Sequence, residues 1–207
     1  KDKHEGMDAL FEAIIESVPA PSGDPDAPFL MQISTLGWRD HIGRTGTGRV
    51  LQGRLHRGDE FKRISTQWKS RHFVLSGSDS DKSDEWEVTD TSAEKAVHLW
   101  VTRGITSQTV KDVFAGDIVT INGPKELNIG DTLCAADLEN VVLPPLEIEE
   151  PTVSMMFMAN TGPFSGKEGN AVTVRQIKTR LERELRTNVA LRVEDTGRSD
   201  GLKVSGR

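Results

Sequence analysis

The sequence contains no tyrosine and only one cysteine, Cys134, among its 207 residues. A lone cysteine cannot form an internal disulfide and is typical of a reducing compartment. Because Cys134 lies in an apolar run, we expect it to be a small core residue. No stretch is long and apolar enough to span a membrane, and no signal-peptide pattern opens the chain. We therefore expect a soluble, cytoplasmic protein with no membrane partner.

An excess of basic residues is also lacking, since 26 Lys and Arg stand against 32 Asp and Glu, for a formal net charge of −6. Any contact with nucleic acid must therefore come from a local basic patch.

Patterns that identify a self-contained active site are missing. The five histidines never occur at metal-ligand spacing. Residues 161–168 superficially resemble a phosphate-binding loop, but its two glycines are one residue too close and Glu168 stands where Ser or Thr would bind magnesium. A calcium loop beginning at Asp79 fails because its sixth and twelfth positions are Asp84 and Asp90. We expect no catalytic, cofactor-binding or metal-binding residue in this chain.

The stretch from Gly43 to Gly58 predicts two consecutive strands of a closed β-barrel. From Arg49 to Arg54, alternate side chains can face a core or water. Basic side chains outnumber acidic ones here, and Arg44, Arg49, Arg54 and His56 are candidate RNA-binding residues. A positive barrel face suits a phosphate backbone. The alternative is that these basic side chains form only the solvated outer face of a structural barrel. Charge alone favours this alternative.

Further short strands separated by glycine turns are typical of an antiparallel barrel. We expect them at residues 29–36, 60–64, 71–76, 97–102, 108–114, 117–122 and 132–134, with a loop at 37–40 and a tight turn at Ala115-Gly116. Residues 77–96 are rich in Ser, Asp, Glu and Thr. They predict an exposed, partly disordered acidic loop.

A clean amphipathic helix is predicted at the start of the chain. Its apolar stripe consists of Met7, Leu10, Phe11, Ile14, Ile15 and Val18, and Pro19 and Pro21 end the helix. Such a stripe needs a cover, so either the helix packs on the barrel or its partner lies upstream.

Composition and periodicity change after a rigid acidic linker at Leu143–Pro151. A strand at 152–160, a helix at about 170–187, a strand at 189–193 and another from Leu202 predict the first part of a split βαβ unit. The helix carries Arg175, Lys178, Arg180, Arg183 and Arg186 against Glu182 and Glu184. The candidates for binding RNA phosphates are Lys167, Arg175, Lys178, Arg180 and Arg183. The alternative is that these charges only keep the helix surface soluble.

Several blocks of sequence resemble the TypA/BipA family of translational GTPases. They are Leu10-Phe11 to Ile14 with Val18-Pro19-Ala20-Pro21, Gly48-Arg49-Val50, Ala115-Gly116-Asp117, Ile129 to Cys134, Pro144-Pro145-Leu146, Glu150-Pro151-Thr152, Asn160 with Pro163 to Gly166, and Arg180-Leu181 with Thr187 to Thr196. The match covers nearly the whole chain except Trp68–Ala96, which resembles a lineage-specific acidic insertion.

The resemblance implies a mainly β fold. Residues 1–21 would be the C-terminal helix of an absent GTPase domain, 25–143 a translation-factor-type antiparallel β-barrel, and 150–207 a truncated ferredoxin-like α+β domain. The family implies ribosome and ribosomal RNA as partners, similarity to elongation factors, and a role in stress adaptation or ribosome assembly. It also implies GTP and magnesium bound upstream, so that the parent protein hydrolyses GTP and this region alone does not. We expect a monomer.

Two interpretations remain open. Lys1 is not a methionine and the split βαβ unit stops after its third strand, so we expect that both ends are cut and that the chain is the middle of a ribosome-dependent GTPase. The alternative is a self-contained RNA- or protein-binding adaptor without enzymatic activity, or part of a LepA or elongation factor G relative.

Overall fold

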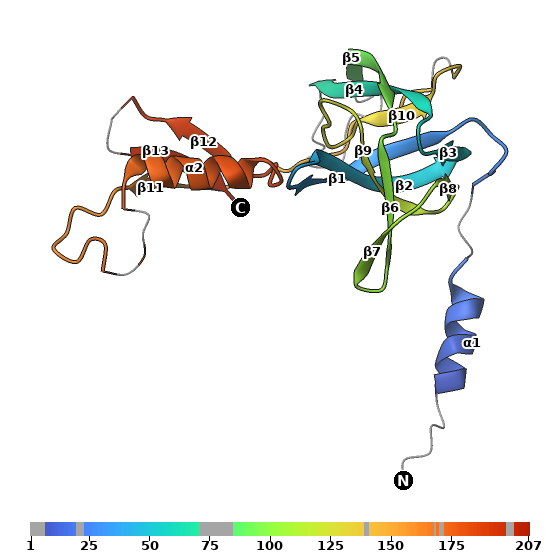
Figure 1. The fold of residues 1–207 in the computed structure, drawn as a ribbon, viewed down its shortest axis with the longest axis horizontal. Helices are drawn as coiled ribbons and strands as arrows, with labels where there is room; N and C mark the ends of the chain where they lie inside the picture. Colours follow the sequence, from blue (N-terminus) through green and yellow to red (C-terminus); the bar gives the residue numbers. More distant parts are fainter. Residues whose placement is uncertain are drawn as a thin grey trace, which may run out of the picture.

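The computed structural model describes residues 7–19, 23–70, 85–138, 141–167, 169, 172–197 and 201–207. The elements that it describes are α1 (Met7–Ser17), β1 (Leu30–Arg39), β2 (Gly43–Gln52), β3 (Arg54–His56), β4 (Glu60–Ser70), β5 (Glu85–Lys95), β6 (His98–Arg103), β7 (Thr106–Thr109), β8 (Asp112–Phe114), β9 (Ile118–Asn122), β10 (Thr132–Ala135), β11 (Val153–Met158), α2 (Val174–Leu185), β12 (Arg192–Asp195) and β13 (Gly201–Gly206) (Figure 1). The predicted mainly β fold is confirmed. Neither of the two helices in the described residues has the length and apolar content that a membrane crossing needs.

Eight strands form one antiparallel sheet in the order β5-β4-β10-β1-β2-β9-β6-β7, and β3 pairs with β8 in a separate ribbon. Phe61 of β4 and Leu99 of β6 belong to the same buried cluster. Their strands are five places apart in this order, which is about 24 Å across a flat sheet. The sheet must therefore curve around one interior, and Leu55 and Val113 of the β3–β8 ribbon fill the same interior.

The alternation predicted from Arg49 to Arg54 is confirmed from Arg49 to Leu51 and is wrong beyond it, because Gly53 is buried and Arg54 is exposed. Val50 is fully buried between exposed Arg49 and exposed Leu51. Gly48 lies so close to β1 that a Cβ there would sit 1.9 Å from the carbonyl oxygen of Gln32. Only glycine allows β1 and β2 to approach this closely.

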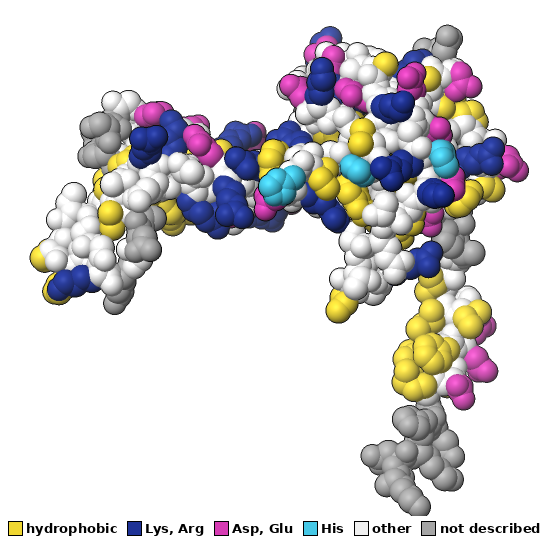
Figure 2. All heavy atoms as spheres, viewed as in Figure 1, with side chains coloured by type: hydrophobic (Ala, Val, Ile, Leu, Met, Phe, Trp, Pro, Cys, Tyr) yellow, Lys and Arg dark blue, Asp and Glu magenta, His cyan; other side chains and the backbone are white. Residues whose placement is uncertain are grey.

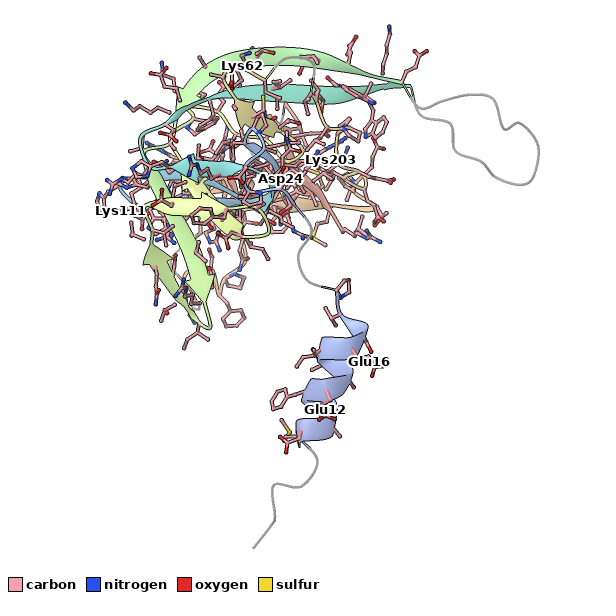
Figure 3. The ribbon with its side chains drawn as sticks, turned by 90° about the vertical axis from the view of Figure 1, so that its right-hand side faces the viewer. Glu12, Glu16, Asp24, Lys62, Lys111 and Lys203 are labelled. Carbon is pink, nitrogen blue, oxygen red and sulfur yellow. The ribbon has the colours of Figure 1, made fainter. Side chains whose placement is uncertain are left out.

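The prediction of an acidic loop over 77–96 is wrong for residues 85–95. This segment is β5, which pairs with β4 from Glu60 opposite Lys95 to Ser70 opposite Glu85 and brings Trp68 opposite Trp86. Cross-strand pairs, including this aromatic one, outweigh the polar composition of the strand. Figure 3 shows the long β4–β5 ribbon along one side of the sheet. The predicted strand at 71–76 and residues 77–84 lie outside the described residues.

A buried polar cluster connects β4 to β5 and to the turn at Asn128–Asp131. The guanidinium of Arg63, which is only 3% exposed, forms ion pairs with Asp90 of β5 and with Asp131. Ser65 donates a 2.7 Å hydrogen bond to Asp131, and the backbone N–H of Asn128 donates another of 2.8 Å. The carboxylate of Asp131 is thus satisfied by one charge and two hydrogen bonds, as a buried charge requires.

Three further boundaries differ from the prediction. The expected loop at 37–40 is mostly strand, because β1 continues to Arg39 opposite Gly43. The expected strand at 108–114 is two strands, since β7 pairs with β6 and β8 pairs with β3. The strand expected at 189–193 begins only at Arg192, where pairing with Ser205 starts.

The C-terminal strands form a sheet in the order β11-β13-β12, with α2 between β11 and β12 in the sequence. The third strand therefore lies between the first two, as a split βαβ unit requires. A capping box of Thr173 and Gln176 begins α2, so the helix starts later than the predicted position 170. Its residues Val174, Ile177 and Leu181 are partly buried, and Leu202 and Val204 of β13 are buried.

The predicted N-terminal helix is confirmed as α1, and it buries none of its residues. Hydrophobic side chains gather on one side of α1 and carboxylates on the other (Figure 2). Glu12 and Glu16, one turn apart, project from the helix in Figure 3. In the described residues the barrel does not cover the apolar stripe, so the expected packing of this helix on the barrel is not found. A partner upstream of the helix stays a prediction.

The turn at Ala115-Gly116 supplies a stability prediction. Gly116 has a φ of 96°, and its N–H donates a 2.8 Å hydrogen bond to the carbonyl of Val50. A β-branched side chain resists this left-handed conformation, so Gly116→Val should lower the free energy of unfolding by about 1–3 kcal/mol. Gly116→Asn is the matched control, because asparagine tolerates positive φ. Denaturant unfolding of both variants tests this, and equal loss in the two would contradict the role of backbone conformation.

Candidate nucleic-acid interface

The four candidates on the barrel differ in how free their charges are. Arg49 is exposed on β2 between Gln32 of β1 and Ile118 of β9. Arg44 is half-buried, and its guanidinium donates a 3.1 Å hydrogen bond to the carbonyl of Leu127. Arg44 therefore helps to hold the loop that precedes β10, whereas Arg49 presents its charge to solvent.

Carboxylates surround the other two barrel candidates. The Nδ1 atom of His56 lies 2.6 Å from Oδ1 of Asp112 on the paired strand. Arg54 is exposed, and it lines a hollow of about 440 Å³ together with Asp59, Glu60 and Asp137. Negative charge next to these side chains weakens their attraction for a phosphate.

The helix α2 carries the densest group of candidates. Its partly buried residues Val174, Ile177 and Leu181 recur at helical spacing, so the charged residues between them face solvent. Arg175, Lys178, Arg180 and Arg183 are all exposed. Arg180 pairs with Glu184 one turn later, and the first turn of the helix contains no acidic residue. Figure 2 shows the dark blue side chains gathered along α2 and towards the eight-stranded sheet.

The C-terminal end of α2 meets the β1–β2 hairpin. The guanidinium carbon of Arg186 lies 4.6 Å from the ring centroid of Trp38 on β1. A second such pair joins β1 to β6, where the guanidinium carbon of Arg39 lies 4.4 Å from the ring centroid of Trp100. These arginines place their guanidinium groups over aromatic rings, a contact that charge counting in the sequence does not predict.

The last candidate, Lys167, lies in the loop between β11 and α2. Its Nζ atom lies 4.9 Å from the ring centroid of Phe164, and both side chains are exposed. The sequence prediction included Lys167 but not Phe164. An aromatic residue three positions before a lysine in a glycine-rich loop was the available signal.

Other chemistry has little support in the described residues. Across these ranges, no group of three or more His, Cys, Asp or Glu side chains is placed to bind a metal ion. The expected core position of Cys134 is confirmed, since it is fully buried beside Leu30 and Ile64. Burial raises the pKa of the Cys134 thiol, and the positive charge of Lys62 opposes the shift. The protonated, buried thiol is a poor nucleophile.

Comparison with known proteins gives close relatives over the full chain. The chain is 42% identical over 208 aligned residues to the large ribosomal subunit assembly factor BipA of Escherichia coli K12, covering all of this chain and 30% of that protein. The proteins of the same name from Salmonella typhimurium and Bacillus subtilis are 42% and 34% identical, with the same coverage. The chain thus spans about 30% of the length of these relatives. No protein-family model matches it.

Proposed function

Because this chain belongs to the TypA/BipA family, whose members it matches along all its residues, we propose that it is the ribosome-docking region of a BipA-like translational GTPase. The observation that carries the proposal is the match, along the whole of this chain, to about 30% of proteins named large ribosomal subunit assembly factor. The proposed partners are the ribosome and ribosomal RNA, and the proposed location is the cytoplasm. Assembly of the large subunit is the role that the relatives' name favours, and a role in stress adaptation stays a prediction.

The arrangement of the chain suggests a division of labour. Residues 25–143, with the curved sheet, would form the barrel domain, and residues 150–207 would be part of a ferredoxin-like domain. Residues 1–21 would belong with a GTPase domain that lies outside these 207 residues. The uncovered apolar stripe of α1 supports this assignment, since an apolar face of that size needs a partner.

The proposed mechanism is coupling rather than chemistry. GTP and magnesium would bind in the GTPase domain, and this region would hold that domain in a productive position on the ribosome. The cations on α2 and the exposed Arg49 would contact phosphates, which supply most of the affinity of proteins for RNA surfaces without base specificity.

Two measurements on the 207-residue chain test the proposal. In sedimentation with purified ribosomes at low salt, we expect the chain to pellet with ribosomes and to stay in solution without them. In calorimetric titration with GTP and magnesium, we expect no binding, because the nucleotide site is assigned elsewhere. Failure to pellet at any salt concentration would contradict ribosome docking, and micromolar GTP binding would contradict the assignment of the nucleotide site.

A further inference from the structure

The loop from Asn160 to Lys167 presents an aromatic ring to solvent. Phe164 is 70% exposed and lies at the centre of two successive turns. The N–H of Ser165 donates to the carbonyl of Gly162, and the N–H of Lys167 donates to the carbonyl of Phe164. Gly166 adopts a φ of 81° between them, which only glycine accepts easily. The loop is thus folded on itself while its one aromatic side chain points outward.

The Phe164 ring contacts one cation and is otherwise largely exposed. Lys167 places its ammonium 4.9 Å from the ring centroid, which is a cation–π contact. With 70% of the residue exposed, the ring is accessible to a second planar group. A lysine held against the ring also places a positive charge beside anything that stacks there.

The loop ends next to the basic helix. A Cβ added to Gly166 would lie 3.7 Å from Cγ1 of Val172, and Val172 immediately precedes the helix N-cap Thr173. Arg175 is in the first turn of α2, and Lys178 follows in the next turn. Residues 160–167 contain no acidic residue, although Glu168 follows in the sequence. An aromatic face and three cations, Lys167, Arg175 and Lys178, therefore belong to one short stretch of chain.

Building on the RNA contact proposed above, we propose that Phe164 is a stacking platform for one unpaired nucleobase of RNA, with Lys167 and Arg175 holding the adjoining phosphates. Proteins bind single-stranded nucleic acid through this pairing of aromatic faces with cations, because each base has a π-face and each linkage a negative charge. Helical RNA, whose bases are already stacked, would contact only the cations. The site therefore selects loops, bulges and ends over continuous duplex.

Fluorescence anisotropy with labelled RNA oligomers tests this proposal on the full chain. The probes are a 12-nucleotide single strand and a strand of the same length in which every base is removed. We expect the parent chain to bind the intact strand about tenfold more tightly than the abasic one, the range that stacking of one base supplies. Phe164→Leu keeps apolar volume but has no aromatic face, so it should bind both strands with the affinity of the abasic complex. Phe164→Trp should preserve the preference.

The matched control is Phe114→Leu, which alters a phenylalanine of β8 that is also exposed, at 47%. This variant should bind both strands as the parent does. Equal binding of the intact and abasic strands by the parent, or an unchanged preference in Phe164→Leu, would overturn the stacking proposal.

The stacking proposal and the docking proposal can fail separately. If the chain pellets with ribosomes but gives either of these results, only the stacking proposal is wrong. If the chain prefers intact RNA but never pellets with ribosomes, only the docking proposal is wrong. Loss of binding to anionic phospholipid vesicles in Phe164→Leu, with RNA binding unchanged, would assign the loop to membranes instead.

Discussion

Replacing Arg63 with methionine is expected to lower the free energy of unfolding by about 3–5 kcal/mol, the cost of leaving a buried charge without its partner. Methionine fills a similar volume but removes the positive charge that faces Asp131, a residue only 1% exposed. The carboxylate of Asp131 would keep its hydrogen bonds from Ser65 and Asn128 and lose its ion pair. Urea unfolding of the parent and the variant, followed by circular dichroism, measures the difference.

Asp90→Asn is the matched control for this cluster. Asp90 is the other carboxylate partner of Arg63, but its side chain is 56% exposed. Water can solvate both groups at that edge, so the loss should stay below about 1 kcal/mol. If Arg63→Met and Asp90→Asn cost the same, burial does not govern the energetics of this cluster and the account of β5 attachment is wrong.

Neutralising the cations of α2 is expected to have the largest effect on ribosome binding. The variant replaces Arg175, Lys178, Arg180 and Arg183 with glutamine, whose helix propensity is close to that of Arg and Lys. We expect ribosome affinity near 50 mM salt to fall at least about tenfold, because each lost phosphate contact removes counterion release. The difference from the parent should shrink as salt rises. Sedimentation over a series of salt concentrations measures both effects.

A control with the same change in net charge separates local contact from overall charge. Lys69, Lys95, Lys111 and Lys125 are exposed and lie outside the candidate group. Their replacement by glutamine should lower ribosome affinity much less than the α2 variant does. Equal losses in the two variants would show that α2 has no special contact with the ribosome and is only a solvated face.

Much of the β architecture could be predicted because it depends on local patterns. The alternation around Val50 and the glycine turn at Gly116 identify strands and their connections from neighbouring residues alone. The strand β5 could not be predicted, since its stability depends on pairing with β4 and on the distant Arg63. Long-range pairing of this kind leaves no periodic signal in a Ser- and Asp-rich segment.

The candidate interface was only partly predictable for a similar reason. Sequence periodicity places the four cations of α2 off its apolar stripe, and the structure exposes all of them. It cannot tell that Arg44 is engaged by the carbonyl of Leu127 or that Arg54 shares a hollow with three carboxylates. Nor does it predict that Lys167 lies over Phe164. These contacts depend on how the chain turns, which charge counting does not describe.

The ribosome affinity of the unaltered 207-residue chain, measured across a salt series, decides whether this chain docks on RNA. Docking through RNA phosphates predicts that the logarithm of the affinity falls linearly with the logarithm of salt concentration, with a slope of about −0.7 to −0.9 for each phosphate contacted. A flat dependence, or no binding at the lowest salt concentration, would contradict an RNA-docking role for this chain.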